Sequence, residues 1–155
     1  MKLSKATAYA LHGMMYMVRH RTQLPISVGM IARSEGIPVA YLSKLFQRLM
    51  KAGYIKAEKG RHKGYVFARE PEAISLLELF ETIEGKPLFE ECLLKHCVCS
   101  GTPENCQIYR QWRTMTQQIT HLFAETSLVT ATWEHPQHNF HDLPAVYSFG
   151  GSTNR

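Results

Sequence analysis

Residues 27–68 read SVGMIARSEGIPVAYLSKLFQRLMKAGYIKAEKGRHKGYVFA, and the order of helix and turn signals in them decides the fold. Ser27 is a good N-cap for a short helix, and Gly36 suits the left-handed position at the C-terminal end of that helix. Pro38 is tolerated as the first residue of a second helix, which Gly53 ends. The second helix has an apolar stripe made of Leu42, Leu45, Phe46 and Leu49. Two short helices joined through a glycine predict a helix-turn-helix.

The residues that follow predict a β-hairpin. The runs YIKAE and GYVFA are rich in strand formers and flank the polar tip KGRHK. A helix-turn-helix followed by a basic hairpin is a winged helix, in which the second helix fits the major groove of DNA and cationic wing residues reach neighbouring phosphates. We therefore expect a mostly α-helical protein with a small β-hairpin wing. An exposed amphipathic helix without a ligand is a weaker alternative, because turn, helix and basic hairpin occur together. The expected DNA-contacting residues are Tyr41, Ser43, Lys44, Gln47 and Arg48 on the helix, with Lys59, Arg61 and Lys63 on the wing.

The charged residues divide into a basic block and an acidic block. The net charge of +5 and isoelectric point of about 9.1 favour a polyanionic partner only weakly. Between residues 44 and 63, however, seven lysines and arginines face Glu58 alone, whereas between residues 70 and 91 seven glutamates face Lys86 alone. This separation predicts two surfaces with different tasks, although either block by itself could be a solvated helix face.

The start of the chain, MKLSKATAYALHGMMYMV, predicts a helix capped by Ser4. It imitates a secretion signal but has no small-x-small cleavage site and contains His12, so we expect a buried helix in a cytoplasmic protein. No apolar run approaches the roughly 20 residues that a membrane span needs.

The second half of the chain predicts two more helices. A capping box that begins at Ser75 opens a helix that Gly85 ends. Beyond Cys106 the apolar residues alternate spacings of four and three, with Thr126 in one slot. This heptad pattern predicts a long helix over residues 107–133 that packs along a partner helix, with a core helix within one subunit as the alternative. The expected dimer-interface residues are Ile108, Trp112, Met115, Ile119 and Leu122.

All four cysteines lie between residues 92 and 106, and disulfides, a bound metal and chance compete to explain the cluster. Since cytosolic thiols are kept reduced, the expected location argues against disulfides. Four thiolates suit zinc, although the Cys97-x-Cys99 pair is tighter than the usual zinc spacing. A thiol redox enzyme using Cys97 and Cys99 is an alternative of another class, but no thioredoxin-like strand and helix pattern surrounds the pair. A winged helix that binds a protein partner and has lost its sensor is a third possibility. We expect a protein that is not an enzyme.

One known family has the same order of motifs. The run GMIARSEGIPVAYLSKLFQRLMKAGYIKAEKGRHKGYVFAREPEAISLLELFETIEG resembles the winged-helix core of the Rrf2 family of bacterial regulators, which includes IscR, NsrR, RirA and CymR, and the similarity covers residues 1–133. The resemblance implies a homodimeric transcription regulator, most often a repressor, on a partly palindromic operator in double-stranded DNA, with no small-molecule substrate. We expect one structural domain with four segments: a DNA-binding winged helix-turn-helix (1–85), a cysteine sensor loop (86–106), a dimerisation helix (107–133) and a flexible tail (134–155).

The chain departs from the family pattern in its DNA-binding residues. The family's wing commonly reads Arg-Gly-x-x-Gly-Gly-Tyr, whereas this chain has Lys59 for the first arginine and Lys63 for one glycine. A lysine cannot make the bidentate contacts of an arginine, so wing contacts become more purely electrostatic. IscR-like members have a glutamate where this chain has Ser43, so their operator sequence cannot be transferred.

The resemblance also suggests a use for the cysteines. Members that sense through an iron–sulfur cluster hold it with three cysteines of this loop. The best correspondence is Cys92, Cys99 and Cys106, with Cys97 as the alternative middle ligand.

The fourth ligand of the cluster differs among relatives. Some use an acidic residue where this chain has Ala8, and others a histidine where it has Tyr109. His12, one helical turn beyond Ala8, is then a candidate beside Cys97 or an exogenous ligand, although a lone helix histidine is more often a satisfied core residue. A 2Fe–2S cluster is slightly favoured over 4Fe–4S, and zinc is the alternative. The expected signal is redox state, nitric oxide or the supply of iron–sulfur clusters.

Overall fold

The computed structural model describes residues 3–60, 63–92 and 104–132. Its elements are α1 (Lys5–Arg19), α2 (Val28–Ser34), α3 (Val39–Lys51), β1 (Ile55–Glu58), β2 (Gly64–Phe67), α4 (Leu76–Glu84), α5 (Gln107–Glu125) and α6 (Leu128–Ala131), with 3-10 turns at Arg21–Gln23 and Pro71–Ala73. The predicted fold class is confirmed: over the described ranges the chain is mostly helical, with a two-stranded antiparallel hairpin.

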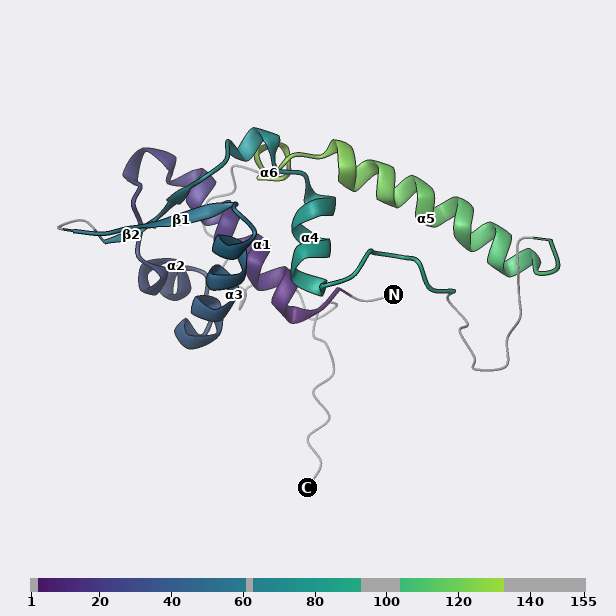
Figure 1. Cartoon of the computed structure of the whole chain (residues 1–155), viewed down its shortest axis with the longest axis horizontal. Helices are drawn as coiled ribbons and strands as arrows, with labels where there is room; N and C mark the ends of the chain where they lie inside the picture. Colours follow the sequence, from purple (N-terminus) through teal and green to yellow (C-terminus); the bar gives the residue numbers. More distant parts are fainter. Residues whose placement is uncertain (1–2, 61–62, 93–103, 133–155) are drawn as a thin grey trace, which may run out of the picture.

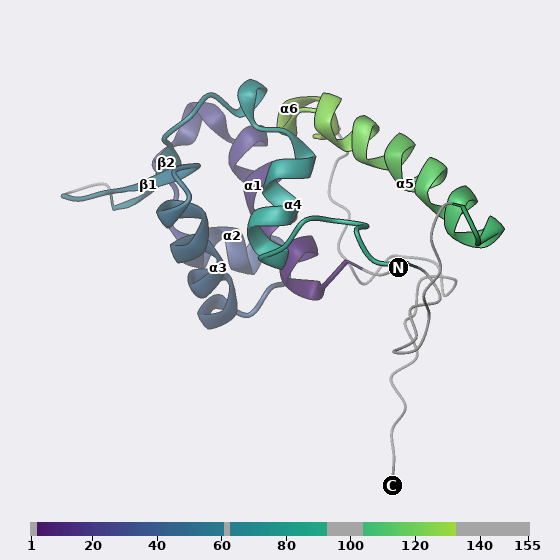
Figure 2. The same cartoon turned by 45° about the vertical axis from the view of Figure 1, so that its right-hand side comes forward.

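Helix α1 lies at the centre of the helical part and packs against α2, α3, α4 and α6. The hairpin and α5 extend from opposite sides of this helical part, as two views of the molecule show (Figure 1 and Figure 2). Within the described residues, no helix is both long and apolar enough to cross a membrane.

The helix ends follow the predicted local signals. The hydroxyl oxygens of Ser4, Ser27 and Ser75 each accept a hydrogen bond from the backbone N–H three residues later, which satisfies one of the free donors at each helix start. Gly85 ends α4 in the left-handed conformation, with φ of 73°. Pro38 differs by one position: it is the residue before α3 rather than its first helical residue.

A glycine lets the recognition-helix candidate α3 pack closely on α1. A Cβ added to Gly13 of α1 would lie 2.8 Å from Cε1 of Phe46, a buried residue of α3. The stripe predicted along α3 is buried and joins the core together with Met14 and Met17 of α1 and Leu79 of α4. The orientation of α3 is therefore set by this packing.

The hairpin is anchored to the helix-turn-helix by its second strand. Ile55 pairs with Phe67 and Glu58 with Gly64, and Tyr65 exchanges backbone hydrogen bonds with Ile26, just before α2. A Cβ on Gly64 would lie within 2.7 Å of the Ile26 backbone nitrogen, so the strand can approach this closely only with glycine there.

The prediction of a single long helix over residues 107–133 is wrong, because the helix breaks at Thr126. Thr126 is extended, with ψ of 113°, and its carbonyl accepts the N–H of Leu76. The N–H of Leu128 in turn donates to Ile74, and Ser127 caps the new helix α6. Leu128 is fully buried, so backbone pairing and core packing against the start of α4 outweigh continuation of the helix.

Three other predicted features fall wholly or partly outside the described residues. They are the tail (134–155), the middle of the cysteine loop with Cys97 and Cys99, and Arg61 at the tip of the wing.

Candidate nucleic-acid interface and cysteine loop

The outer face of α3 presents four of the predicted DNA-contacting side chains to solvent, namely those of Tyr41, Lys44, Gln47 and Arg48. They alternate with the buried apolar stripe. The Tyr41 ring meets Tyr9 of α1 edge to face, with 5.7 Å between the ring centroids. This aromatic contact holds the first turn of α3 against α1 and limits the positions open to Tyr41.

Ser43, which is half-buried, and Arg48, which is exposed, also make hydrogen bonds within the chain. Ser43 donates its hydroxyl to the Val39 carbonyl at 2.8 Å. Arg48 donates from Nη2 to the carbonyls of Thr82 and Ile83, at 3.2 and 2.7 Å. Arg48 therefore connects α3 to the last turn of α4.

The sequence prediction missed two exposed apolar residues on the same part of the fold. Met30 of α2 is 46% exposed and Val39, the first residue of α3, is 45% exposed. The one signal available in the sequence was that Val39 falls outside the apolar stripe of α3. Aliphatic groups at the start of a recognition helix can contact thymine methyl groups in the major groove.

The wing adds cationic side chains to this half of the molecule. Lys59 and Lys63 are exposed. Lys56 lies 3.7 Å from Glu58, so its charge is partly compensated on the strand. Figure 1 shows α3 and the hairpin on the same side of the molecule, opposite α5.

The described part of the cysteine loop contains two free thiols, Cys92 and Cys106, both half-buried. Cys106 is the N-cap of α5, and its Sγ accepts the N–H of Tyr109 at 3.4 Å. The sulfur atom of Cys106 therefore faces the first turn of α5.

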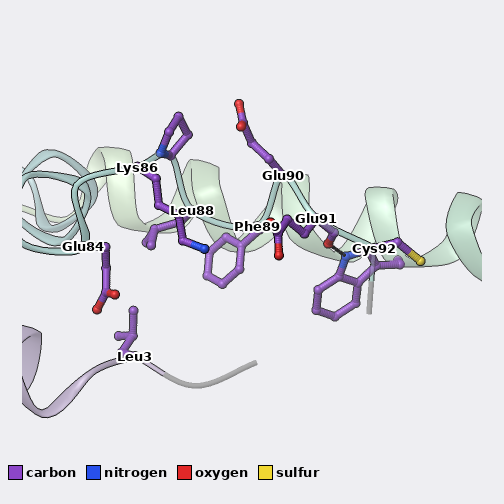
Figure 3. Close-up of a pocket in the computed structure, with 10 residues that line it drawn as sticks. Leu3, Glu84, Lys86, Leu88, Phe89, Glu90, Glu91 and Cys92 are labelled. Carbon is purple, nitrogen blue, oxygen red and sulfur yellow. Dashed lines mark hydrogen bonds between the residues drawn. The ribbon is translucent and has the colours of Figure 1, made fainter. Parts of the chain in front are cut away.

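Cys92 lies at the edge of a cavity of about 310 Å³ between the loop, the start of α1 and α5. Figure 3 shows Glu84 beside Leu3 at one end of this cavity and the Cys92 side chain at the other. Trp112 of α5 lines the cavity and donates its indole N–H to the Glu91 carbonyl at 2.9 Å. A residue predicted for the dimer interface therefore also ties α5 to the loop of its own chain.

Cys92 and Cys106 are free cysteines at the two ends of the stretch 92–106, and cysteine sulfur is a ligand of both iron–sulfur clusters and zinc. The ranges that the structure describes contain no group of three ligand-type side chains that could hold a metal. His12 is 32% exposed, and its Nδ1 lies 3.4 Å from Oε2 of Glu35.

Glu84, the last residue of α4, connects the root of the cysteine loop to α1. Its Oε1 accepts the N–H of Ser4 at 2.9 Å and the hydroxyl of Thr7, which is fully buried. Burial opposes ionisation of Glu84, but the hydrogen bonds from Thr7 and Ser4 outweigh it and lower the pKa of the carboxyl. The loop begins after Gly85, the next residue, and the Leu88 N–H donates to Oε1 of Glu81 at 2.9 Å.

The stripe predicted along α5 divides into an outer and an inner row. Ile108, Met115 and Leu122, seven residues apart, are 50%, 55% and 59% exposed. Trp112 and Ile119 are half-buried on the side nearer the chain's own core. The outer row leaves three large apolar side chains in water on one face of the helix.

Comparisons with known proteins agree with this architecture. The model of the Rrf2 family, described as an iron-dependent transcriptional regulator, matches residues 3–132. A protein of Aquifex aeolicus that carries the name of an HTH-type transcriptional regulator is 30% identical over 129 residues, which cover 83% of this chain and 89% of that protein. The HTH-type transcriptional regulator IscR of Xenorhabdus nematophila is 27% identical over 128 residues, with 83% of this chain and 77% of that protein covered.

A solved structure has the same fold. CymR of Bacillus subtilis, titled the global cysteine regulator of that organism, superposes with a TM-score of 0.71 at 23% identity. The superposition covers 85% of this chain and 96% of that one.

Proposed function

This chain belongs to the Rrf2 family of transcriptional regulators. We propose that it binds operator DNA as a homodimer and represses transcription, and that a metal bound by its cysteine loop controls this binding. Its named relatives are transcriptional regulators, and the chain is not an enzyme. Its place of action is the cytoplasm, where the operator is.

The exposed face of α3 is the observation that supports DNA binding most directly. The face of α3 that is turned away from the core carries the exposed side chains of Tyr41, Lys44 and Gln47. Their polar groups are suited to contact base edges. Lys59 and Lys63 are exposed on the wing, which lies on the same side of the molecule as α3 (Figure 1). We expect both to contact phosphates, together with Arg61, which lies outside the described residues.

The outer row of α5 supports the homodimer. In a two-fold interface the same stripe from each chain meets its copy, so Ile108, Met115 and Leu122 would be removed from water together. Two recognition helices at a fixed separation would then read two half-sites of a partly palindromic operator.

The loop supports a metal-dependent sensor. Cys92, Cys106 and one of Cys97 or Cys99 would hold an iron–sulfur cluster, which supplies sensitivity to oxidation, to nitric oxide and to the supply of iron and sulfide. The 2Fe–2S form is preferred in this proposal, with His12, whose side chain is 32% exposed, as the candidate fourth ligand. The free, half-buried thiol of Cys106 at the start of α5 supports ligation by that residue.

Two measurements test the proposed function. In the first, the wild-type chain is offered a random duplex pool, and we expect a partly palindromic sequence to be enriched; failure to bind any duplex at low salt would contradict DNA binding. In the second, the anaerobically purified chain is assayed for visible absorbance, iron, sulfide and zinc, beside Cys92→Ala and Cys106→Ala. We expect colour in the wild type and its loss in both variants, whereas a colourless wild type with stoichiometric zinc would replace the sensor with a zinc-stabilised loop.

A further inference from the structure

The last turn of α4 is the point where three segments of the chain meet. Arg48 of α3 binds its carbonyls, Ser4 and Thr7 of α1 bind the side chain of Glu84, and the cysteine loop begins directly after Gly85. The last four carbonyls of a helix have no partner within the helix, so a nearby cation is the expected partner for them.

Arg48 satisfies two of these carbonyls from another helix. Its Nη2 donates to Thr82 at 3.2 Å and to Ile83 at 2.7 Å, and a Cβ added to Gly85 would lie 4.0 Å from the same nitrogen. Hydrogen bonds from a charged donor are among the stronger ones in proteins, and the negative end of the helix dipole strengthens them further.

We propose that Arg48 is a positioning residue that links the recognition helix to the root of the cysteine loop, and that it does not contact DNA. The proposal rests on the proposed DNA-binding function and names how that function is regulated. A shift of the loop root moves the carbonyls of Thr82 and Ile83, and Arg48 transmits that shift to α3, four residues C-terminal to Lys44 on the same helix.

The link also acts in the opposite direction. Coupling between two sites is reciprocal in binding free energy, so DNA held by α3 must bias the conformations of residues 82–92. A residue that only contributed stability to the fold would not produce this dependence on DNA.

The test compares Arg48→Met, which keeps a long apolar stem, with Lys51→Met as the control that removes an exposed cation from the same helix. Deuterium uptake of residues 82–92 is measured in each protein with and without a duplex selected by the wild type. We expect Arg48→Met to raise uptake there without DNA and to abolish the change that DNA induces, while Lys51→Met behaves as the wild type. Operator affinity should fall about 5-fold or more in Arg48→Met, with an unchanged slope of log affinity against log salt.

The opposite result identifies Arg48 as a DNA contact. Unchanged uptake of residues 82–92 together with a salt slope flattened by about 0.9 would overturn the proposal. If Arg48→Met does not fold, Arg48→Lys takes its place in the test. Because this variant keeps the charge, the salt slope no longer discriminates, and the deuterium uptake of residues 82–92 alone decides: raised uptake supports the link and unchanged uptake overturns it. If the wild type binds no duplex, the proposed function fails, but uptake in the DNA-free proteins still shows whether Arg48 holds the loop root.

Discussion

Substitution of Leu122 tests the proposed dimer at the place where the monomer needs the side chain least. Leu122 is 59% exposed, the largest value in the outer row of α5. Full burial of a leucine side chain contributes about 1.5–3 kcal/mol, so covering the exposed part contributes about 0.9–1.8 kcal/mol. Each residue occurs twice in a symmetric dimer, which doubles the effect to about 1.8–3.5 kcal/mol. At 1.4 kcal/mol for each factor of ten, Leu122→Ala should weaken dimerisation roughly 20- to 300-fold.

The assay is sedimentation velocity over a dilution series, with circular dichroism to verify that each variant is folded. Leu122→Glu should give monomers at concentrations where the wild type is dimeric, because it would bury a charge without a partner. Gln117→Glu is the matched control, since Gln117 is exposed on the opposite face of α5. The outer row of α5 is not the interface if Leu122→Glu and Gln117→Glu sediment alike as dimers.

Three further predictions separate the roles of individual residues. Lys63→Ala should weaken binding to every duplex alike and flatten the salt slope by about 0.9; an unaltered slope would exclude Lys63 from the phosphate contacts. Gln47→Ala removes no charge, so it should leave that slope unchanged and relax operator preference by roughly 1–3 kcal/mol; selection of the wild-type consensus by this variant would contradict the assignment. Thr7→Val removes a hydrogen bond that lowers the pKa of Glu84. Because the pKa of Glu84 is lower in the folded state, its ionised carboxyl stabilises the fold at a pH above the ordinary pKa of glutamate, and this stabilisation is lost as the pH falls through the lowered pKa. The variant should therefore lose more unfolding free energy at about pH 7 than at about pH 2. Equal losses at the two pH values in chemical denaturation would show that Thr7 does not stabilise ionised Glu84.

Much of the fold and part of the candidate site could be predicted from the sequence, because the signals are local. Ser4, Ser27 and Ser75 cap helices through an N–H three residues away, and Gly85 adopts its left-handed conformation within one turn. The exposed positions of Lys44 and Gln47 follow from the period of the apolar stripe on α3. Periodicity likewise placed an apolar stripe on α5, since it depends only on residues within two turns of one another.

Tertiary structure decided the features that depend on partners far along the chain. Periodicity places Arg48 on the exposed face of α3, but it gives no sign of the hydrogen bonds that Arg48 makes to carbonyls 34 and 35 residues away in α4. The heptad pattern continued through Thr126, yet pairing with Leu76 and burial of Leu128 break the helix there. The periodicity of a single helix contains no information about which neighbour covers each side chain or competes for each backbone group. That choice depends on how the helices pack, and packing also determines which half of the α5 stripe remains exposed.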